Sequence, residues 1–338
     1  MKHLILSAVL ALSPAHAIAQ NSAPIIADVV NGHILPGFDA LAARAAGLAH
    51  AAENECSPNS VALQTAYGHA FDAWISVSHL RFGPTEENDR AFALAFWPDT
   101  RGVTPRSLSK LIATQDSIAE SPAEYQQVSI AARGFYALEF LLFDDRLRTA
   151  ADPNYHCRLI QTITQDIQAN SQAIKTDWHE GYAAQILTPR QDGLYRTEEE
   201  ILQELFKTLT TGLQFTSETR LARPLGSFDK PRPKRAESWR SGRTAQHLQL
   251  SLHALGDLAA RLSGANPALR EKLKVSFELP IAQILAINDP TLAGVSDPQQ
   301  RFKIEVIQQS VNTVREVVEN ELGPVLGVSA GFNALDGD

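Results

Sequence analysis

Long segments rich in alanine, leucine, glutamine and glutamate dominate this chain and constrain its fold more than any other feature. Alternating runs of β-branched residues and Asn-Gly turns between apolar segments, which mark strands and hairpins, are missing. Residues 121–124 (SPAE) and 197–200 (TEEE) each supply a polar N-cap with an acid at the third helical position. Helices are expected near residues 37–54, 60–81, 105–119, 122–144, 153–179, 196–221, 236–263, 267–287 and 299–322. The sequence therefore predicts an all-α protein.

The length of the chain predicts two domains. Without a leader, roughly 320 residues remain, which is more than one hydrophobic core usually organises. Residues 188–196 (TPRQDGLYR) contain proline and glycine and lack apolar periodicity, which favours a boundary there. The expected division is a helical bundle over residues 20–190 and a second helical bundle over residues 191–338.

Residues 1–19 have the pattern of a signal peptide. Lys2 and His3 precede an apolar run over residues 4–12, and Ala17 and Ala19 form a small-x-small cleavage signal. No cysteine follows the cleavage point, so a lipid anchor is not expected. No later apolar stretch approaches the ~18 residues that span a bilayer. We therefore expect an exported, soluble protein of the periplasm.

The charge balance excludes general nucleic-acid binding. Without Lys2, 29 basic residues face 38 acidic ones, so the net charge is −9. An acidic surface repels the phosphate backbone, and no nucleic-acid partner is expected.

The two cysteines are an even count in an oxidising compartment. A disulfide between Cys56 and Cys157 is the simplest assignment, and two free buried thiols are the alternative. The disulfide would close a loop of ~100 residues, worth up to ~4.7 kcal/mol in the chain-entropy model.

One apolar segment carries an isolated acid. Residues 134–143 (GFYALEFLLF) contain a single charge, Glu139, and residues 331–336 (GFNALD) match the glycine, phenylalanine, alanine and leucine, with an acid last. Residues 72–74 (DAW) correspond loosely to residues 237–239 (ESW). These matches indicate a diverged internal repeat, although so short a string also arises by chance or common packing.

An ionised carboxylate costs several kcal/mol to bury without a partner, which makes Glu139 a candidate site residue. Tyr136 lies one helical turn earlier on the same face. The two could form a hydrogen-bonded pair, an oxygen-rich metal corner or a proton relay. The alternative is a structural glutamate bonded to Tyr136 or to an arginine on another helix.

Residues 220–243 form the most basic segment of the acidic chain. On a helix expected to begin at residue 236, Arg240 and Arg243 would share one face and could fork a carboxylate, either a substrate's or that of Glu139. A solvated loop is the simpler interpretation of the charges in residues 230–235.

Several segments together resemble the imelysin-like family of bacterial exported proteins. They are residues 33–36 (HILP), Trp74 with residues 81–84 (RFGP), residues 96–99 (FWPD), 134–143, 237–243 and 331–338. The resemblance implies two domains, each resembling a four-helix bundle, with a candidate site where they meet.

The family's motif is Gly-x-His-x-x-Glu, a proposed metal-ligand pair, and here Tyr136 replaces the histidine between Gly134 and Glu139. Phenolate and carboxylate oxygens suit ferric iron better than zinc. The replacement is equally compatible with a loss of metal binding.

The resemblance implies iron-related physiology. The ligand would be iron or another metal ion, a metal chelate or another small molecule. Glu139 and Asp336 are the candidate metal ligands. The other candidate ligand-binding residues are Tyr136, Asn333, Trp239, Arg240, Ser241, Arg243, Arg81 and Trp97. An exported metallopeptidase is one alternative, and a non-catalytic module that binds an envelope protein is another. A zinc hydrolase needs about three protein ligands. The chain contains no His-Glu-x-x-His, so we do not favour an enzyme.

Overall fold

The structure, a computed structural model, describes residues 22–329 of the 338-residue chain. The predicted signal peptide and the second copy of the repeat, with Asn333 and Asp336, lie outside the described residues. Within residues 22–329 the regular structure is helical, apart from one isolated bridge between Ser227 and Lys230. The all-α prediction is confirmed.

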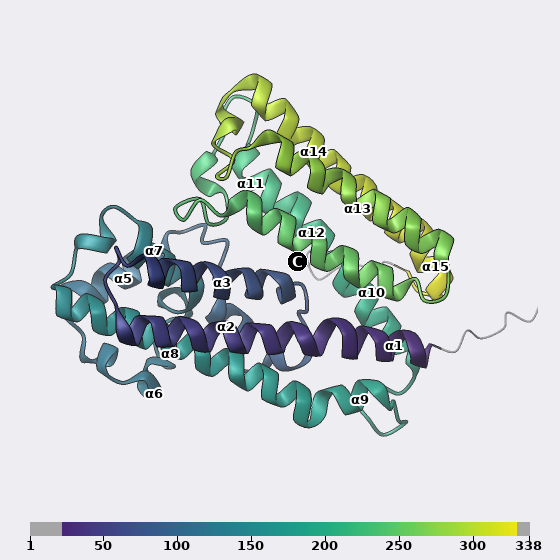
Figure 1. The fold of residues 1–338 in the computed structure, drawn as a ribbon, viewed down its shortest axis with the longest axis horizontal. Coiled ribbons are helices and arrows are strands. Elements are labelled where there is room, and N and C mark those ends of the chain that lie inside the picture. The colour runs from purple at the N-terminus through teal and green to yellow at the C-terminus, as the bar shows by residue number, and fades with distance from the viewer. Residues whose placement is uncertain (1–21, 330–338) are drawn as a thin grey trace, which may run out of the picture.

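The helices fall into the two sequence halves (Figure 1). Those before residue 190 are α1 (Ala23–Val29), α2 (Leu35–Asn54), α3 (Val61–Val77), α4 (Arg90–Leu94), α5 (Val103–Thr114), α6 (Pro122–Tyr125), α7 (Gly134–Phe143), α8 (Pro153–Asp177) and α9 (Ala183–Leu187). Those after it are α10 (Glu198–Gln214), α11 (Ala222–Leu225), α12 (Thr244–Leu262), α13 (Pro267–Ile287), α14 (Pro298–Val317) and α15 (Gly323–Leu326).

Both halves are built by antiparallel helix packing, and they also pack on each other. Helix α2 packs against α3 and α8, and α7 packs against α8. In the second half, α12, α13 and α14 pack in sequence, with α10 against α12 and α14. Helix α3 contacts α12, and α1 contacts α10 and α12, so helices of both halves lie side by side (Figure 1). Residues 188–197 lie outside the helices, as expected of a connection. The division into two domains stays a prediction.

The predicted disulfide is confirmed. Cys56, just after α2, is bonded to Cys157 in α8. The bond ties together two helices that already pack against each other.

Helices α1 and α2 run as one 32-residue helix, Ala23–Asn54, whose length and composition would be enough to cross a membrane. Half of its most apolar window is buried in the protein. Val29, Ile34, Phe38, Leu41 and Leu48 of this helix are fully buried in the core. A core helix accounts for this apolarity.

Several long helices contain a π-helical turn. These turns are Val30–Ile34, Trp178–Tyr182, Phe215–Leu221 and Val318–Leu322. A proline follows three of them within three residues, at Pro36, Pro224 and Pro324. Proline removes a backbone donor and crowds the preceding turn, and a widened turn accommodates both effects.

The expected helix over residues 122–144 is wrong, because the structure breaks it into α6 and α7. Gly134 has φ of +74°. A Cβ at this position would lie 2.2 Å from the carbonyl oxygen of Leu94. Only glycine allows this close approach, and the chain turns before α7 begins. The break places α7 as a short apolar helix in the core, with Glu139 as the sixth of its ten residues.

Candidate functional site

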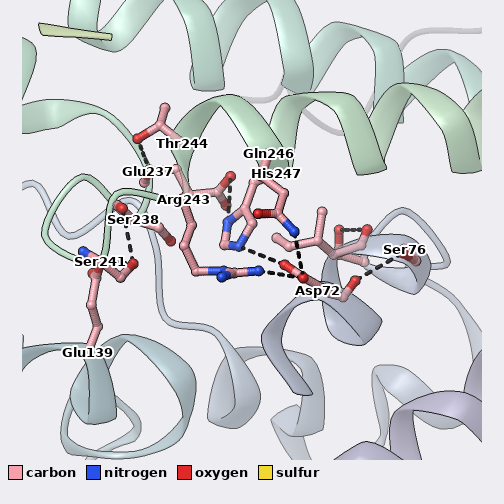
Figure 2. A network of polar contacts seen from close by, with 12 residues as sticks. Asp72, Ser76, Glu139, Glu237, Ser238, Ser241, Arg243, Thr244, Gln246 and His247 are labelled. Atoms are coloured by element: carbon pink, nitrogen blue, oxygen red, sulfur yellow. Dashed lines mark hydrogen bonds and ion pairs between the residues drawn. The ribbon is translucent and has the colours of Figure 1, made fainter. Parts of the chain in front are cut away.

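Glu139 is buried and bonded to the second half of the chain. Its carboxylate is 2% exposed. Oε1 accepts hydrogen bonds from the backbone N–H of Ser241 at 3.0 Å and from the Ser241 hydroxyl at 2.8 Å (Figure 2). Burial raises the pKa of Glu139, although the hydrogen bonds from Ser241 oppose the rise. The carboxylate therefore connects α7 to the segment that precedes α12.

Tyr136 has a different partner from Glu139. Its hydroxyl donates to Oε1 of Glu237 at 2.5 Å, and Arg220 donates from Nε to Oε2 of the same carboxylate at 2.8 Å. Burial and the neighbouring carboxylate of Glu237 hold the pKa of Tyr136 well above its ordinary value. The phenol stays protonated, and Tyr136 and Glu139 do not form a hydrogen-bonded pair.

The segment over residues 236–243 is a turn rather than the first part of a helix. Ser238 and Gly242 have φ of +53° and +69°, which end helical geometry, and α12 begins at Thr244. The hydroxyl of Thr244 donates to the backbone carbonyl of Glu237 at 2.6 Å. This turn presents the acidic side chain of Glu237 and the Ser241 donors to α7.

The two arginines of this turn bind separate carboxylates instead of forking that of Glu139. Nε of Arg240 donates to Oδ2 of Asp144 at 3.0 Å, and the guanidinium lies 3.8 Å from the centre of the Phe140 ring. Arg243 donates to Asp72 of α3 instead. The fork required a helix from residue 236, and the turn removes the shared face.

His247 of α12 lies between two carboxylates and is fully buried. Its Nε2 is 3.6 Å from Oδ1 of Asp72, and its Nδ1 is 3.9 Å from Oε2 of Glu237 (Figure 2). Burial, with Arg243 and Arg220 nearby, holds the pKa of His247 well below its ordinary value. A neutral imidazole carries one N–H, so it can serve as donor to one of these carboxylates at a time.

A cavity of about 350 Å³ opens beside this network. It is lined by Val61, Gln64, Thr65, Tyr67, His69, Asp72, Phe143, Ser241, Arg243 and Gln246. The Tyr67 hydroxyl is fully buried and makes no hydrogen bond of normal geometry, although Ser241 lies beside it. Nε of Arg243 and Oδ1 of Asp72 are also buried without a hydrogen-bond partner. Tyr67, Arg243 and Asp72 therefore line the cavity, and each has one buried polar atom without a hydrogen-bond partner among the described residues.

The residues of the predicted metal pair do not fit a metal held directly by Tyr136 and Glu139. Oε1 of Glu139 already accepts two hydrogen bonds, and a ferric tyrosinate would need a deprotonated phenol. Within residues 22–329, no three histidine, cysteine, aspartate or glutamate side chains gather closely enough to hold a metal ion. Asp336 lies outside these residues.

Of the remaining predicted site residues, Trp97 and Trp239 lie near the network, whereas Arg81 does not. Trp97 lies near the network, with its ring 6.2 Å from that of Tyr136, and Trp239 stacks with Arg240 at 4.5 Å. Arg81 is bonded to Glu86 at 2.6 Å at the end of α3, and the structure does not bring it to Glu139.

A second polar cluster, in which the two histidines are buried and the aspartate is exposed, joins the two halves. Nε2 of His33 lies 2.9 Å from Nε2 of His79, and Nδ1 of His33 lies 2.7 Å from Oδ2 of Asp257 in α12. Burial opposes ionisation of Asp257, but hydrogen bonds from His33 and Arg261 lower its pKa to about 2. The cluster connects the π-helical turn at Val30–Ile34 to α12.

No sequence feature identified Tyr67, Arg220 and His247 as parts of the site. Asp72 and Glu237 were noted only as corresponding positions of the repeat, yet the structure brings both carboxylates to His247. The available signal was a polar side chain within an apolar helical segment, as at Asp72 between Phe71 and Ala73. That signal marks burial and does not identify the partner.

The chain matches the family model described as Imelysin (Peptidase_M75) over residues 34–318. An imelysin-like protein from Psychrobacter arcticum 273-4 has a similar crystal structure, with a TM-score of 0.77 and 16% identity, covering 92% of this chain and 97% of that one. A protein from Parabacteroides distasonis ATCC 8503, described as an iron-regulated protein A precursor, has a TM-score of 0.73 and 15% identity. That match covers 89% of this chain and 94% of the other. At such identities the structures show a shared fold. The comparison with curated proteins finds no match.

Proposed function

The chain belongs to the imelysin family, and from this premise we propose that it is an exported periplasmic binding protein for a small polar ligand. The ligand occupies the cavity between α3, α7 and the turn over residues 236–243. We propose an iron-related ligand, with a ferric chelate as the first class to test.

The observation that carries the proposal is the set of unused polar atoms in the cavity wall. The Tyr67 hydroxyl and Nε of Arg243 are donors, and Oδ1 of Asp72 is an acceptor. Leaving one buried polar group unsatisfied costs about 1–3 kcal/mol. We propose that these three cavity-lining side chains shift to meet the oxygens of a bound ligand and so recover part of that free energy, which selects for a polar molecule of matching shape.

Two considerations support a chelate over a bare ion. The buried carboxylates already have hydrogen-bond donors or guanidinium partners, since Glu139 accepts from Ser241 and Asp72 accepts from Arg243 and Gln246. A chelate supplies the metal's ligands itself and presents its own oxygens to the wall. The link to iron rests on the structural relative described as an iron-regulated protein A precursor and on the resemblance stated above.

The preorganised turn explains how the site keeps its shape without a ligand. Glu237 is held by Tyr136, Arg220 and, through its backbone, Thr244. Ser241 is held by Glu139. Because these bonds come from both halves of the chain, the shape of the cavity wall depends on the contact between the two halves.

The test is a binding titration with ferric citrate and with free ferric ion, followed by tryptophan fluorescence, alongside elemental analysis of the purified protein. Glu139→Gln should abolish binding with little loss of helix content, because the amide weakens the contact with Ser241 that places the turn. Tyr67→Phe removes one unused donor and should weaken binding about tenfold, as expected for one hydrogen bond.

Tyr155→Phe is the matched control, because it removes a tyrosine hydroxyl that donates to the backbone carbonyl of Asp116. It should leave the affinity unchanged. Equal affinity for the wild-type and Tyr67→Phe proteins would contradict the proposed site. Peptide hydrolysis that requires added zinc would favour the metallopeptidase, and capture of one envelope protein without any small ligand would favour the interaction module.

A further inference from the structure

The loop between α11 and α12 (Figure 1) contains four basic residues close together in the sequence. Lys230, Arg232, Lys234 and Arg235 are all exposed. None of them forms an ion pair with a carboxylate of the described residues, although most other basic side chains there do. The whole chain has a net charge of −8, so this loop is a local reversal of sign.

These cations are held close together by the backbone. The N–H of Arg232 donates to the carbonyl of Pro224 at 2.8 Å, and Ser227 pairs with Lys230 in the isolated bridge. The N–H of Arg235 donates to the carbonyl of Arg232 at 2.8 Å. Pro231 and Pro233 restrict the chain further. These backbone contacts and the two prolines therefore restrain the conformation of the loop.

An exposed aromatic ring accompanies the cations. Phe228 is 73% exposed, the most exposed large aromatic side chain of the described residues. At the base of the loop, the ammonium of Lys234 lies 5.5 Å from the centre of the Trp239 ring. Burial, together with the adjacent Arg235 guanidinium, lowers the pKa of Arg223.

We propose that this loop, residues 226–235, docks the protein on an anionic phospholipid surface. The cations attract the headgroup phosphates, and Phe228 inserts its ring at the boundary between headgroups and acyl chains. An exposed phenylalanine within a basic loop gains free energy only when an apolar phase lies next to the anions. A lipid bilayer offers both over an extended surface, whereas an acidic polysaccharide offers the charge alone.

The proposal predicts binding to vesicles of phosphatidylglycerol and phosphatidylethanolamine, and little binding to phosphatidylcholine vesicles, in co-sedimentation at low salt. Each cation near an anionic surface contributes about fivefold to the partition coefficient. Replacing Lys230, Arg232, Lys234 and Arg235 with glutamine should therefore reduce binding more than a hundredfold. Phe228→Ser should reduce it about tenfold and leave its salt dependence unchanged, because the charge is retained.

The matched control replaces Lys207, Lys272 and Lys274 with glutamine, since these lysines are also half-exposed but lie outside the loop. That variant should keep its vesicle binding. The helix content of every variant is checked by circular dichroism. Equal binding to both kinds of vesicle, no binding to either, or unchanged binding in the loop variants would overturn the proposal. Stronger retention on an immobilised acidic polysaccharide than on vesicles, lost in the four-glutamine variant but retained in Phe228→Ser, would also overturn it.

Discussion

Replacing Arg220 with methionine should destabilise the protein by about 3–5 kcal/mol, because the change leaves a buried carboxylate without its counter-charge. The Arg220 and Glu237 side chains are 5% and 3% exposed, with Nε 2.8 Å from Oε2. Arg220 also donates to the hydroxyls of Ser251 at 2.8 Å and Ser78 at 3.4 Å. Methionine fills much of the same volume, so the cost comes from the lost charge and hydrogen bonds rather than from a cavity. Since domains are typically stable by about 5–15 kcal/mol, this is a large fraction.

A double-variant cycle separates the charge effect from simple loss of packing. Urea unfolding of the wild type, Arg220→Met, Glu237→Gln and the double variant gives four free energies of unfolding. The double variant should be more stable than the sum of the single changes predicts, by about 1–3 kcal/mol, because no unpaired charge remains. Arg315→Met is the control, since Arg315 is 30% exposed and its partners Glu218 and Glu319 are 53% and 28% exposed, and it should cost at most about 1 kcal/mol. Additive effects in the cycle would refute the reasoning, as would an Arg220→Met cost no larger than that of the control.

Three further predictions concern pH, the disulfide and the start of α7. Burial holds the pKa of His79 well below its ordinary value of 6.5, so the unfolded chain binds more protons and stability falls as pH drops below about 6.5. The urea midpoint should fall accordingly between about pH 6.5 and 5, with a shallower slope in His79→Gln, and an unchanged slope would contradict this assignment. Reducing the bond between Cys56 and Cys157 should lower the free energy of unfolding by up to about 4.7 kcal/mol, and thiol titration of the denatured, unreduced protein should find no free thiol. Gly134→Ala should cost at least about 2 kcal/mol because of its positive φ and the carbonyl that its Cβ would meet. Gly47→Ala, in open space on α2, should be neutral or stabilising in the same thermal melts.

Local patterns in the sequence were enough to predict the helical class, because helical periodicity and the lack of strand signals depend on near neighbours along the chain. The caps at Ser121 and Thr197 were also predictable, and both side chains accept the expected backbone N–H. The break between α6 and α7 was not predictable. It depends on how closely Gly134 approaches α4, a contact between segments 40 residues apart that periodicity does not report.

The features of the candidate site were likewise predictable from the sequence only in part. The sequence by itself determined that Glu139 is buried, because its neighbours on α7 are apolar on every side. It also determined that two cysteines were available for one bond. Only the tertiary structure decided the hydrogen-bond partners. Ser241 donates to Glu139, Tyr136 donates to Glu237, and Arg243 donates to Asp72. Burial follows from the hydrophobicity of a segment, whereas a hydrogen-bond partner is set by the packing of α3, α7 and the turn before α12, which brings together residues more than 100 positions apart.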